Sequence, residues 1–189
     1  MPDFAPRLRC LSAALLPLLA ACQPAGPEGA RPAAGPGVLM QADFEQSIGW
    51  GSADVVSLTT EQAHSGRWSL RVAPEVPFGY TYSRPLGELS ATPLRELQLE
   101  GWVRRPAPGS TARLVVQVDS SASSEVKVFY LAYPLEKAVP DLNKWTRVQI
   151  PLTLPTSAKG SNQLKIYLWN EQATAPTFLD DLTLRRRPD

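Results

Sequence analysis

Residues 163–169 have the sequence QLKIYLW, in which every second residue is aliphatic. Leucine, isoleucine and leucine alternate with lysine, tyrosine and tryptophan. Side chains that alternate in this way point to opposite faces of a β-strand. We therefore predict a strand here, with its aliphatic face in the core and an aromatic and polar face turned the other way.

The same period of two continues outward from this stretch in both directions. No segment shows the three-and-four apolar spacing and the end caps of a helix. About ten short strands separated by turn-rich segments predict an all-β fold, an antiparallel jelly-roll β-sandwich. The predicted strands are Val38–Phe44, Ala53–Thr59, Trp68–Ala73, Phe78–Leu86, Leu94–Arg104, Ala112–Asp119, Glu125–Tyr133, Trp145–Leu152, Gln163–Trp169 and Thr177–Leu184.

The composition excludes several classes of function. The 189 residues include 19 Lys and Arg, 18 Asp and Glu, two Cys and one His, and the formal net charge is +1. Such a balance gives no overall electrostatic basis for binding nucleic acid. One histidine leaves little for a zinc site or a nucleophilic triad, and no spacing of carboxylates selects a hydrolytic pair. We predict a protein that is not an enzyme and does not bind nucleic acid.

The beginning of the chain has the pattern of an exported protein. A short basic start precedes an apolar run, Leu11–Ala21, which is too short to span a membrane. The tetrapeptide LAAC at 19–22 resembles the lipobox of bacterial lipoproteins. That resemblance implies a signal peptide over residues 1–21, cleavage before Cys22 and lipidation of Cys22. The alternative is an ordinary signal peptide with an incidental cysteine.

The lipoprotein resemblance also implies a location and a domain organisation. Gln23 in place of an aspartate after the cysteine implies the outer membrane in a cell that has two membranes. Residues 22–37 are then the lipidated cysteine and a tether rich in proline, glycine and alanine. Residues 38–187 form the β-sandwich domain. We expect a monomer in the cell envelope, held on the membrane by its lipid anchor.

Four segments of the β-sandwich domain carry a second resemblance. They are DFE at 43–45 followed by GW at 49–50, AHSGRWSLRV at 63–72, GWVR at 101–104 and FLDDLTL at 178–184. In this order they resemble carbohydrate-binding modules of the family 4/9/22 type. The resemblance implies a galactose-binding-like jelly roll and a polysaccharide or oligosaccharide as the partner.

The same resemblance implies a structural calcium ion that joins the first strand to the last. The matching residues are Glu45 and Asp180, with Asp181 as a third candidate. Carboxylates suit a hard cation. Asp180 also shares the parity of Phe178 and Leu182, and a carboxylate on an apolar face needs a cation or several hydrogen-bond donors. The alternative is that Asp180 accepts hydrogen bonds from backbone or arginine groups.

The side chains of each strand that point away from the predicted core form a candidate ligand face. Aromatic rings stack on the C–H face of a sugar ring, while planar polar groups bind its hydroxyls. Tyr167 and Trp169 are the strongest candidates, because both alternate with an aliphatic row. The alternative is that these aromatic residues only pack against the sheet. The candidate ligand-binding residues are Tyr167, Trp169, Trp102, Glu100, Gln117, Tyr80 and Tyr82.

Two hypotheses of function remain open from the sequence. The first is a membrane-anchored lipoprotein with a non-catalytic, glycan-binding β-sandwich module. The second is a structural or protein-interaction lipoprotein of the envelope that uses the same fold without binding sugar. Sandwiches of this kind serve both purposes, so the fold alone does not choose between them.

Overall fold

A computed structural model describes residues 35–45 and 55–187 of the chain. The predicted signal peptide, Cys22, most of the tether and Trp50 lie outside these residues. In the two described ranges, no helix has both the length and the apolar character needed to cross a membrane.

The regular secondary structure of the described residues is almost entirely β-strand, which confirms the predicted fold class. Two four-residue helices, α1 (Leu86–Leu89) and α2 (Leu135–Ala138), and a 3-10 turn at Val55–Ser57 complete the described elements. The strands are β1 Val38–Ala42, β2 Leu58–Thr59, β3 Ser69–Val72, β4 Tyr82–Pro85, β5 Glu96–Arg104, β6 Arg113–Asp119, β7 Lys127–Pro134, β8 Trp145–Thr153, β9 Gln163–Trp169 and β10 Thr177–Arg186.

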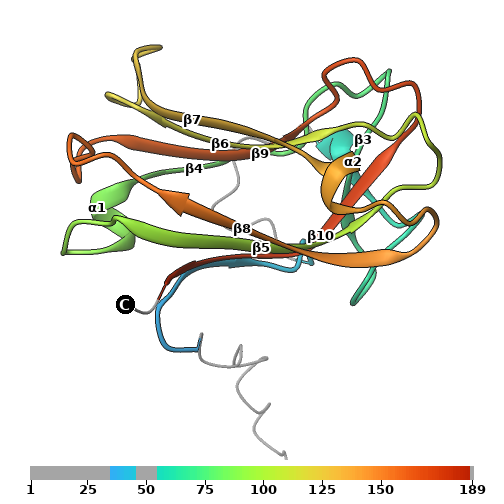
Figure 1. Ribbon diagram of the computed structural model, residues 1–189, viewed down its shortest axis with the longest axis horizontal. Coiled ribbons are helices and arrows are strands. Elements are labelled where there is room, and N and C mark those ends of the chain that lie inside the picture. Colours follow the sequence, from blue (N-terminus) through green and yellow to red (C-terminus); the bar gives the residue numbers. More distant parts are fainter. Residues whose placement is uncertain (1–34, 46–54, 188–189) are drawn as a thin grey trace, which may run out of the picture. The chain divides into compact units, whose positions relative to one another are not determined.

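The strands form two antiparallel sheets that face each other (Figure 1). The six-stranded sheet has the order β2-β3-β10-β5-β8, and β1 also pairs with β10. The four-stranded sheet has the order β4-β9-β6-β7. Figure 1 shows β4, β9, β6 and β7 in one layer and β8, β5 and β10 in the other. This arrangement is an antiparallel jelly-roll sandwich.

The core lies between the two sheets and is built from the aliphatic parity of the strands. Leu164, Ile166 and Leu168 of β9 are fully buried, as are Leu97 and Leu99 of β5. Each such side chain stabilises the fold by about 1.5–3 kcal/mol relative to full exposure. On β5 and β9 the alternation that predicted the strands therefore also identified which side is inside.

The predicted strand Phe78–Leu86 is shorter than expected, since regular pairing begins only at Tyr82. Before Tyr82 the chain still contacts β9, but in a shifted register: the Gly79 N–H donates to the Leu168 carbonyl at 2.8 Å, and Phe78 forms an isolated bridge with Trp169. The alternation is broken over these residues. Tyr82 is consequently in the core, at 7% exposure, whereas Phe78 is on the outer surface, at 55% exposure.

Candidate functional site

A hollow of about 460 Å³ lies on the outer face of the four-stranded sheet. This volume is within the range of ligand-binding pockets. Its lining comes from β9, β6 and β7 and from the segment before β4. The lining residues are Phe78, Gln117, Lys127, Tyr130, Tyr167 and Trp169, which we call the aromatic face.

The pairing register explains why these residues share one side of the sheet. Gln117 of β6 lies opposite Tyr130 of β7 and opposite Lys165 of β9. Directly opposed residues of an antiparallel pair point to the same face. Tyr167 and Trp169 follow Lys165 at steps of two along β9, so they point to that face as well.

Three rings form a wall on one side of the hollow. The Phe78 and Trp169 ring centroids are 6.3 Å apart and their planes differ by 5°, while Phe78 and Tyr167 meet edge-on at 6.3 Å. Phe78 and, across the sheet, Tyr130 are among the large apolar side chains that remain exposed, Tyr130 at 44%. Exposed rings held in place by neighbouring rings are suited to stacking on a ligand.

A polar network beneath the rings holds Tyr167 in position. The Tyr167 hydroxyl donates to Gln117 Oε1 at 3.3 Å, and Gln117 Nε2 donates to Asp119 Oδ1 at 2.7 Å. Asp119 is fully buried, and its Oδ2 forms an ion pair with Lys165 Nζ at 2.8 Å. Burial raises the pKa of the Tyr167 hydroxyl, and Tyr130 and Asp119 raise it further, so this hydroxyl stays protonated and donates.

The structure brings together three of the predicted ligand-binding residues, namely Tyr167, Trp169 and Gln117. Tyr82 lies in the core, and Tyr80 is half-buried and packs against the core. Trp102 and Glu100 belong to β5, which lies in the other sheet between β10 and β8. The predicted grouping is therefore corrected for these four residues, because β5 does not adjoin β9 and the strand 78–86 changes phase before β4.

Glu100 instead forms a polar cluster on the outer side of the six-stranded sheet. Its carboxylate pairs with Arg147, accepts a hydrogen bond from Gln98 Nε2 at 2.7 Å and lies 3.5 Å from Arg185 Nε. Burial acts to raise the pKa of Glu100, but the hydrogen bond from Arg147 and the charges of Arg185 and Arg147 outweigh it, and the pKa is lowered. Glu100 is thus an ionised, internally neutralised group.

Phe78, Lys127 and Tyr130 were not predicted as members of the site. In β7 the two parities are both apolar or aromatic: Val128, Tyr130 and Ala132 alternate with Phe129, Leu131 and Tyr133. Such a pattern does not indicate which side is outside. Phe78 carried an aromatic signal, but the register with β9 shifts between Phe78 and Tyr82, and this shift hid the face that Phe78 occupies.

The predicted calcium ligands lie at a bulge of β10. Residues 177–179 of β10 pair with β3 and residues 182–185 pair with β1, so Asp180 and Asp181 occupy the junction between the two partners. The β10–β5 register shifts at the same point. Asp181 has a positive φ of 48°, the left-handed conformation that asparagine and aspartate tolerate better than most residues.

At this junction the carboxylates hold the loop that precedes β3. Asp180 Oδ2 accepts hydrogen bonds from the backbone N–H groups of His64 and Ser65, at 2.7 and 3.1 Å. Asp181 contacts the His64 ring at Nδ1, 2.6 Å away, and accepts from the Ser65 hydroxyl at 2.7 Å. The His64 ring in turn stacks on Trp102, with centroids 3.9 Å apart.

Glu45, which follows β1, holds the other end of the same loop. Its Oε1 accepts hydrogen bonds from the backbone N–H groups of Arg67 and Trp68, both at 2.7 Å. Between the two held ends, Gly66 has a φ of 57°, and a Cβ there would lie 2.4 Å from Glu45 Oε1. The first part of the segment at 63–72 is thus a loop that acidic side chains fasten to β10 and to the residues after β1, and its last four residues form β3.

These contacts bear on calcium in two ways. Asp180 is fully buried, and burial raises its pKa to about 6 despite the N–H groups of Ser65, His64 and Asp181, which lower it. A cation would offset that cost of burial. Four carboxylate oxygens, however, already accept hydrogen bonds from the loop, and the described residues contain no group of three or more His, Cys, Asp or Glu placed to hold a metal ion. The oxygen donors fit calcium in type but not in grouping, and calcium stays a prediction.

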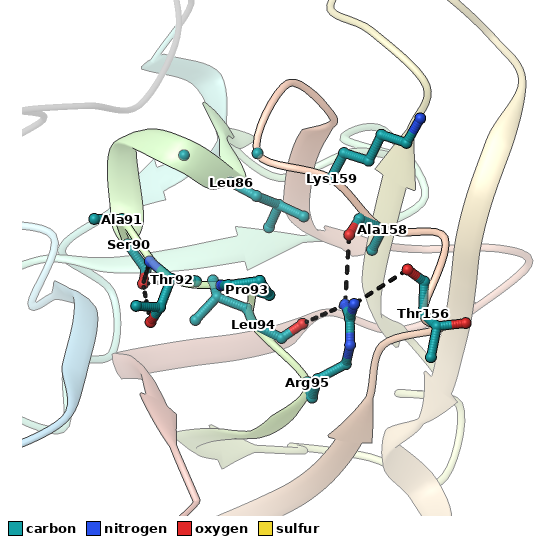
Figure 2. Close-up of a pocket in the computed structure, with 12 residues that line it drawn as sticks. Leu86, Ser90, Ala91, Thr92, Pro93, Leu94, Arg95, Thr156, Ala158 and Lys159 are labelled. Carbon is teal, nitrogen blue, oxygen red and sulfur yellow. Dashed lines mark hydrogen bonds between the residues drawn. The ribbon is translucent and has the colours of Figure 1, made fainter.

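A second hollow, of about 480 Å³, lies beside α1 (Figure 2). Arg95 crosses it, and its guanidinium donates to the backbone carbonyls of Leu94, Thr156 and Ala158 at 3.1–3.4 Å. Figure 2 shows all three bonds, and the two that reach Thr156 and Ala158 join the segment before β5 to the loop after β8. Because the donors of Arg95 are used to join two loops, we interpret this hollow as a structural junction.

A third hollow, of about 730 Å³, adjoins the second one at Pro93 and Arg95. Its arginines are also engaged within the protein. Arg186 donates to the Thr92 hydroxyl at 2.6 Å, and Arg187 lies 3.3 Å from the Glu96 carboxylate. The arginines of the second and third hollows are thus bonded within the protein. The exposed rings of the aromatic face are free to contact a ligand, so we take this face as the candidate site.

No protein-family model matches the chain, and no curated protein sequence matches it. Solved structures do resemble it. The CBM22-2 xylan-binding domain from Paenibacillus barcinonensis Xyn10C has a TM-score of 0.54 and 14% identity, with 79% of this chain and 99% of that domain covered. The CBM22-1-CBM22-2 tandem domain of the same protein has a TM-score of 0.50 and 22% identity, with coverages of 84% and 48%.

A third similar structure comes from Clostridium thermocellum. It contains the CBM22-1-GH10 modules of the endo-1,4-beta-D-xylanase 10B complexed with xylohexaose, with a TM-score of 0.50 and 15% identity. The match covers 81% of this chain and 29% of that longer one. At these identities the likeness shows the fold, which is the β-sandwich of carbohydrate-binding modules.

Proposed function

We propose that this protein is a glycan-binding module without catalytic activity, carried by a lipid-anchored protein of the cell envelope. The observation that carries the proposal is the stacked pair Phe78 and Trp169 beside a hollow on the four-stranded sheet. The fold shared with CBM22 domains, which are described as xylan-binding, supports it. The family resemblance of the motifs supports it independently.

The aromatic face has the chemistry to bind a sugar chain. The wall of Phe78, Tyr167 and Trp169 offers apolar surface for the C–H side of sugar rings, while Tyr130 and Lys127 offer polar groups across the hollow. The sheet surface is open, so a bound sugar keeps much of its hydration. We therefore expect weak affinity, with Kd in the range of about 1 μM to 1 mM.

The composition of the hollow supports a binding role over a catalytic one. Its six lining residues include no carboxylate, histidine, serine or cysteine. Glycoside hydrolysis ordinarily needs two carboxylic groups that flank the scissile bond. Asp119 is the carboxylate bonded to a lining residue, and it is buried and paired with Lys165.

The anchor is a separate part of the proposal and rests on the sequence. The lipobox-like tetrapeptide ends at Cys22, and fifteen residues rich in proline, glycine and alanine follow it. A coil of this length spans about 20 Å. A diacylated or triacylated Cys22 would hold the protein on a membrane stably, whereas one chain gives only marginal binding. The tether would leave the domain free to meet a glycan. We propose the outer membrane as the membrane that holds the anchor.

Glycan binding is tested with a glycan array and a matched pair of variants. The probe is the full chain carrying Cys22→Ser, which lacks the acylated sulfur. Trp169→Ala should weaken binding about tenfold or more, while Trp102→Ala, a tryptophan of the other sheet, should leave it unchanged. Absence of binding to every glycan on the array, or equal loss in both variants, would contradict the proposal.

A protein partner is the second candidate, and the exposed rings of Phe78 and Tyr130 favour it. Tyrosine, tryptophan and phenylalanine are enriched at protein interfaces. A competition experiment with a soluble oligosaccharide distinguishes the two candidates. A sugar site is blocked by a soluble oligosaccharide of the type it binds, whereas a protein interface is not.

A further inference from the structure

We propose that the aromatic face selects acidic glycans, meaning chains that carry uronic acid carboxylates, and that Lys127 is the residue that recognises their charge. This inference rests on the proposed glycan binding and names the class of sugar. It depends on the position of Lys127, the one charged residue among the six that line the hollow.

Lys127 forms no ion pair with the acidic residue that lies opposite it in the sheet. Asp119 lies opposite Lys127 in the β6–β7 ladder. The Asp119 carboxylate is turned instead to Lys165 Nζ, at 2.8 Å, and to the amide of Gln117. Lys127 Nζ lies 5.7 Å from the centre of the Tyr130 ring, and within the described residues no carboxylate comes within 4 Å of it. Its positive charge is therefore uncompensated.

The other polar groups near the hollow are already committed. The Gln117 amide accepts from the Tyr167 hydroxyl through its oxygen and donates to Asp119 through its nitrogen. Lys165 is neutralised by Asp119. Arg113, at the Trp169 end of β6, is neutralised by Glu171. The ligand thus meets a surface whose uncommitted charge is one ammonium group.

The order of residues across the sheet separates apolar from cationic surface. Phe78 and Trp169 lie on the β4–β9 side, and Lys127 lies on β7, at the opposite edge of the sheet. Neighbouring strands are about 4.8 Å apart, so the two sides are roughly two strand spacings apart across the sheet. They are also offset along the strands, because Trp169 lies opposite Arg113 and Lys127 lies opposite Asp119, six residues or about 20 Å further along β6. A sugar chain of several units lying diagonally over the sheet places a ring on the aromatic wall and a substituent at Lys127. A carboxylate there gains an ion pair that a hydroxymethyl group does not.

An exposed lysine on an edge strand has another ordinary role. β7 ends the four-stranded sheet, and charged side chains on edge strands prevent pairing with other chains. In that role Lys127 has no influence on the choice of sugar. The experiment below separates the two, because protection of the edge does not depend on whether a glycan carries carboxylates.

The test compares acidic glycans with neutral forms of the same chains. The full chain carrying Cys22→Ser is titrated with glucuronoxylan and carboxyl-reduced glucuronoxylan, and with polygalacturonate and its fully methyl-esterified form. Binding to the acidic form of at least one pair should be about two- to fivefold tighter, as expected for one exposed ion pair. Added salt should reduce that difference.

Three variants assign the effect to Lys127. Lys127→Gln should abolish the preference and Lys127→Arg should keep it. Lys144→Gln removes the same charge from a side chain that is 72% exposed in the loop before β8, and it should keep the preference. Equal binding of acidic and neutral forms by the parent, or an unchanged preference in Lys127→Gln, would overturn the inference while leaving glycan binding intact. Failure to bind any glycan would overturn the proposed function itself.

Discussion

The rings of Phe78 and Trp169 are stacked with 5° between their planes, although the two residues belong to distant parts of the chain. They form an isolated bridge, and the next residue, Gly79, donates its N–H to the Leu168 carbonyl at 2.8 Å. A Cβ on Gly79 would lie 3.2 Å from the Leu168 Cβ, which is tight. The close approach of residue 79 to β9 thus places one exposed ring against another and creates the wall of the aromatic face.

We predict that Gly66→Ala destabilises the loop between β2 and β3. Alanine is strained at a φ of 57°, and its Cβ would lie 2.4 Å from Glu45 Oε1. The Glu45 carboxylate must then move away from the N–H groups of Arg67 and Trp68. The free energy of unfolding, measured with urea, should fall by about 1–3 kcal/mol.

A double-mutant cycle checks the physical reason for that loss. Glu45→Ala removes the clash and the two hydrogen bonds together. Gly66→Ala should then lower the free energy of unfolding less in the Glu45→Ala background than in the parent, because only the backbone strain remains. Equal costs in both backgrounds would show that the contact with Glu45 is irrelevant.

Calcium, if it binds at the junction of β1, β3 and β10, should raise the melting temperature. A ligand specific for the folded state adds about 2.7 kcal/mol at a hundredfold excess over its Kd. For a domain of this size that corresponds to about 5–10 °C. Scanning calorimetry with calcium and with a chelator measures the difference.

Two variants test whether the difference arises at the predicted ligands. Asp180→Ala should abolish the calcium effect but also release the loop at His64 and Ser65. Glu45→Gln keeps an oxygen acceptor for Arg67 and Trp68 while removing the charge. Identical melting of the parent in calcium and in chelator would contradict the prediction.

Cys22→Ser should prevent lipidation and leave the protein either unprocessed or soluble. The expectation follows from the tetrapeptide at 19–22, since cleavage and acylation both require the cysteine sulfur. Metabolic labelling with a fatty acid, followed by detergent partitioning, measures both steps. Labelling that persists in the variant would show that another residue carries the lipid, or that the protein is held in another way.

The period-two pattern predicted the core correctly on β5, β6 and β9, because the buried parity there is purely aliphatic. It could not predict which strands adjoin, since strand order depends on contacts between distant segments. Glu100 has the same alternation signal as Gln117, yet β5 and β6 lie in different sheets. The acidic residues were identified by motif, but the contacts of Asp180 and Asp181 with the loop depend on the β10 bulge, which the sequence does not display.

We expect different effects on stability from replacing two aromatic residues that lie four positions apart in the sequence, one in the core and one on the aromatic face. Tyr82→Ala removes a ring that is 7% exposed and packed in the core, and it should lower the free energy of unfolding by about 3–5 kcal/mol. Phe78→Ala removes a ring that is 55% exposed, so its cost should stay below about 1 kcal/mol. Binding to a glycan identified on the array should nevertheless weaken in Phe78→Ala, because Trp169 loses the neighbour that holds it parallel. Urea unfolding and glycan titration on both variants measure the two quantities together. A Phe78→Ala protein that is strongly destabilised, or that binds glycan as the parent does, would show that the stacked pair serves packing and not recognition.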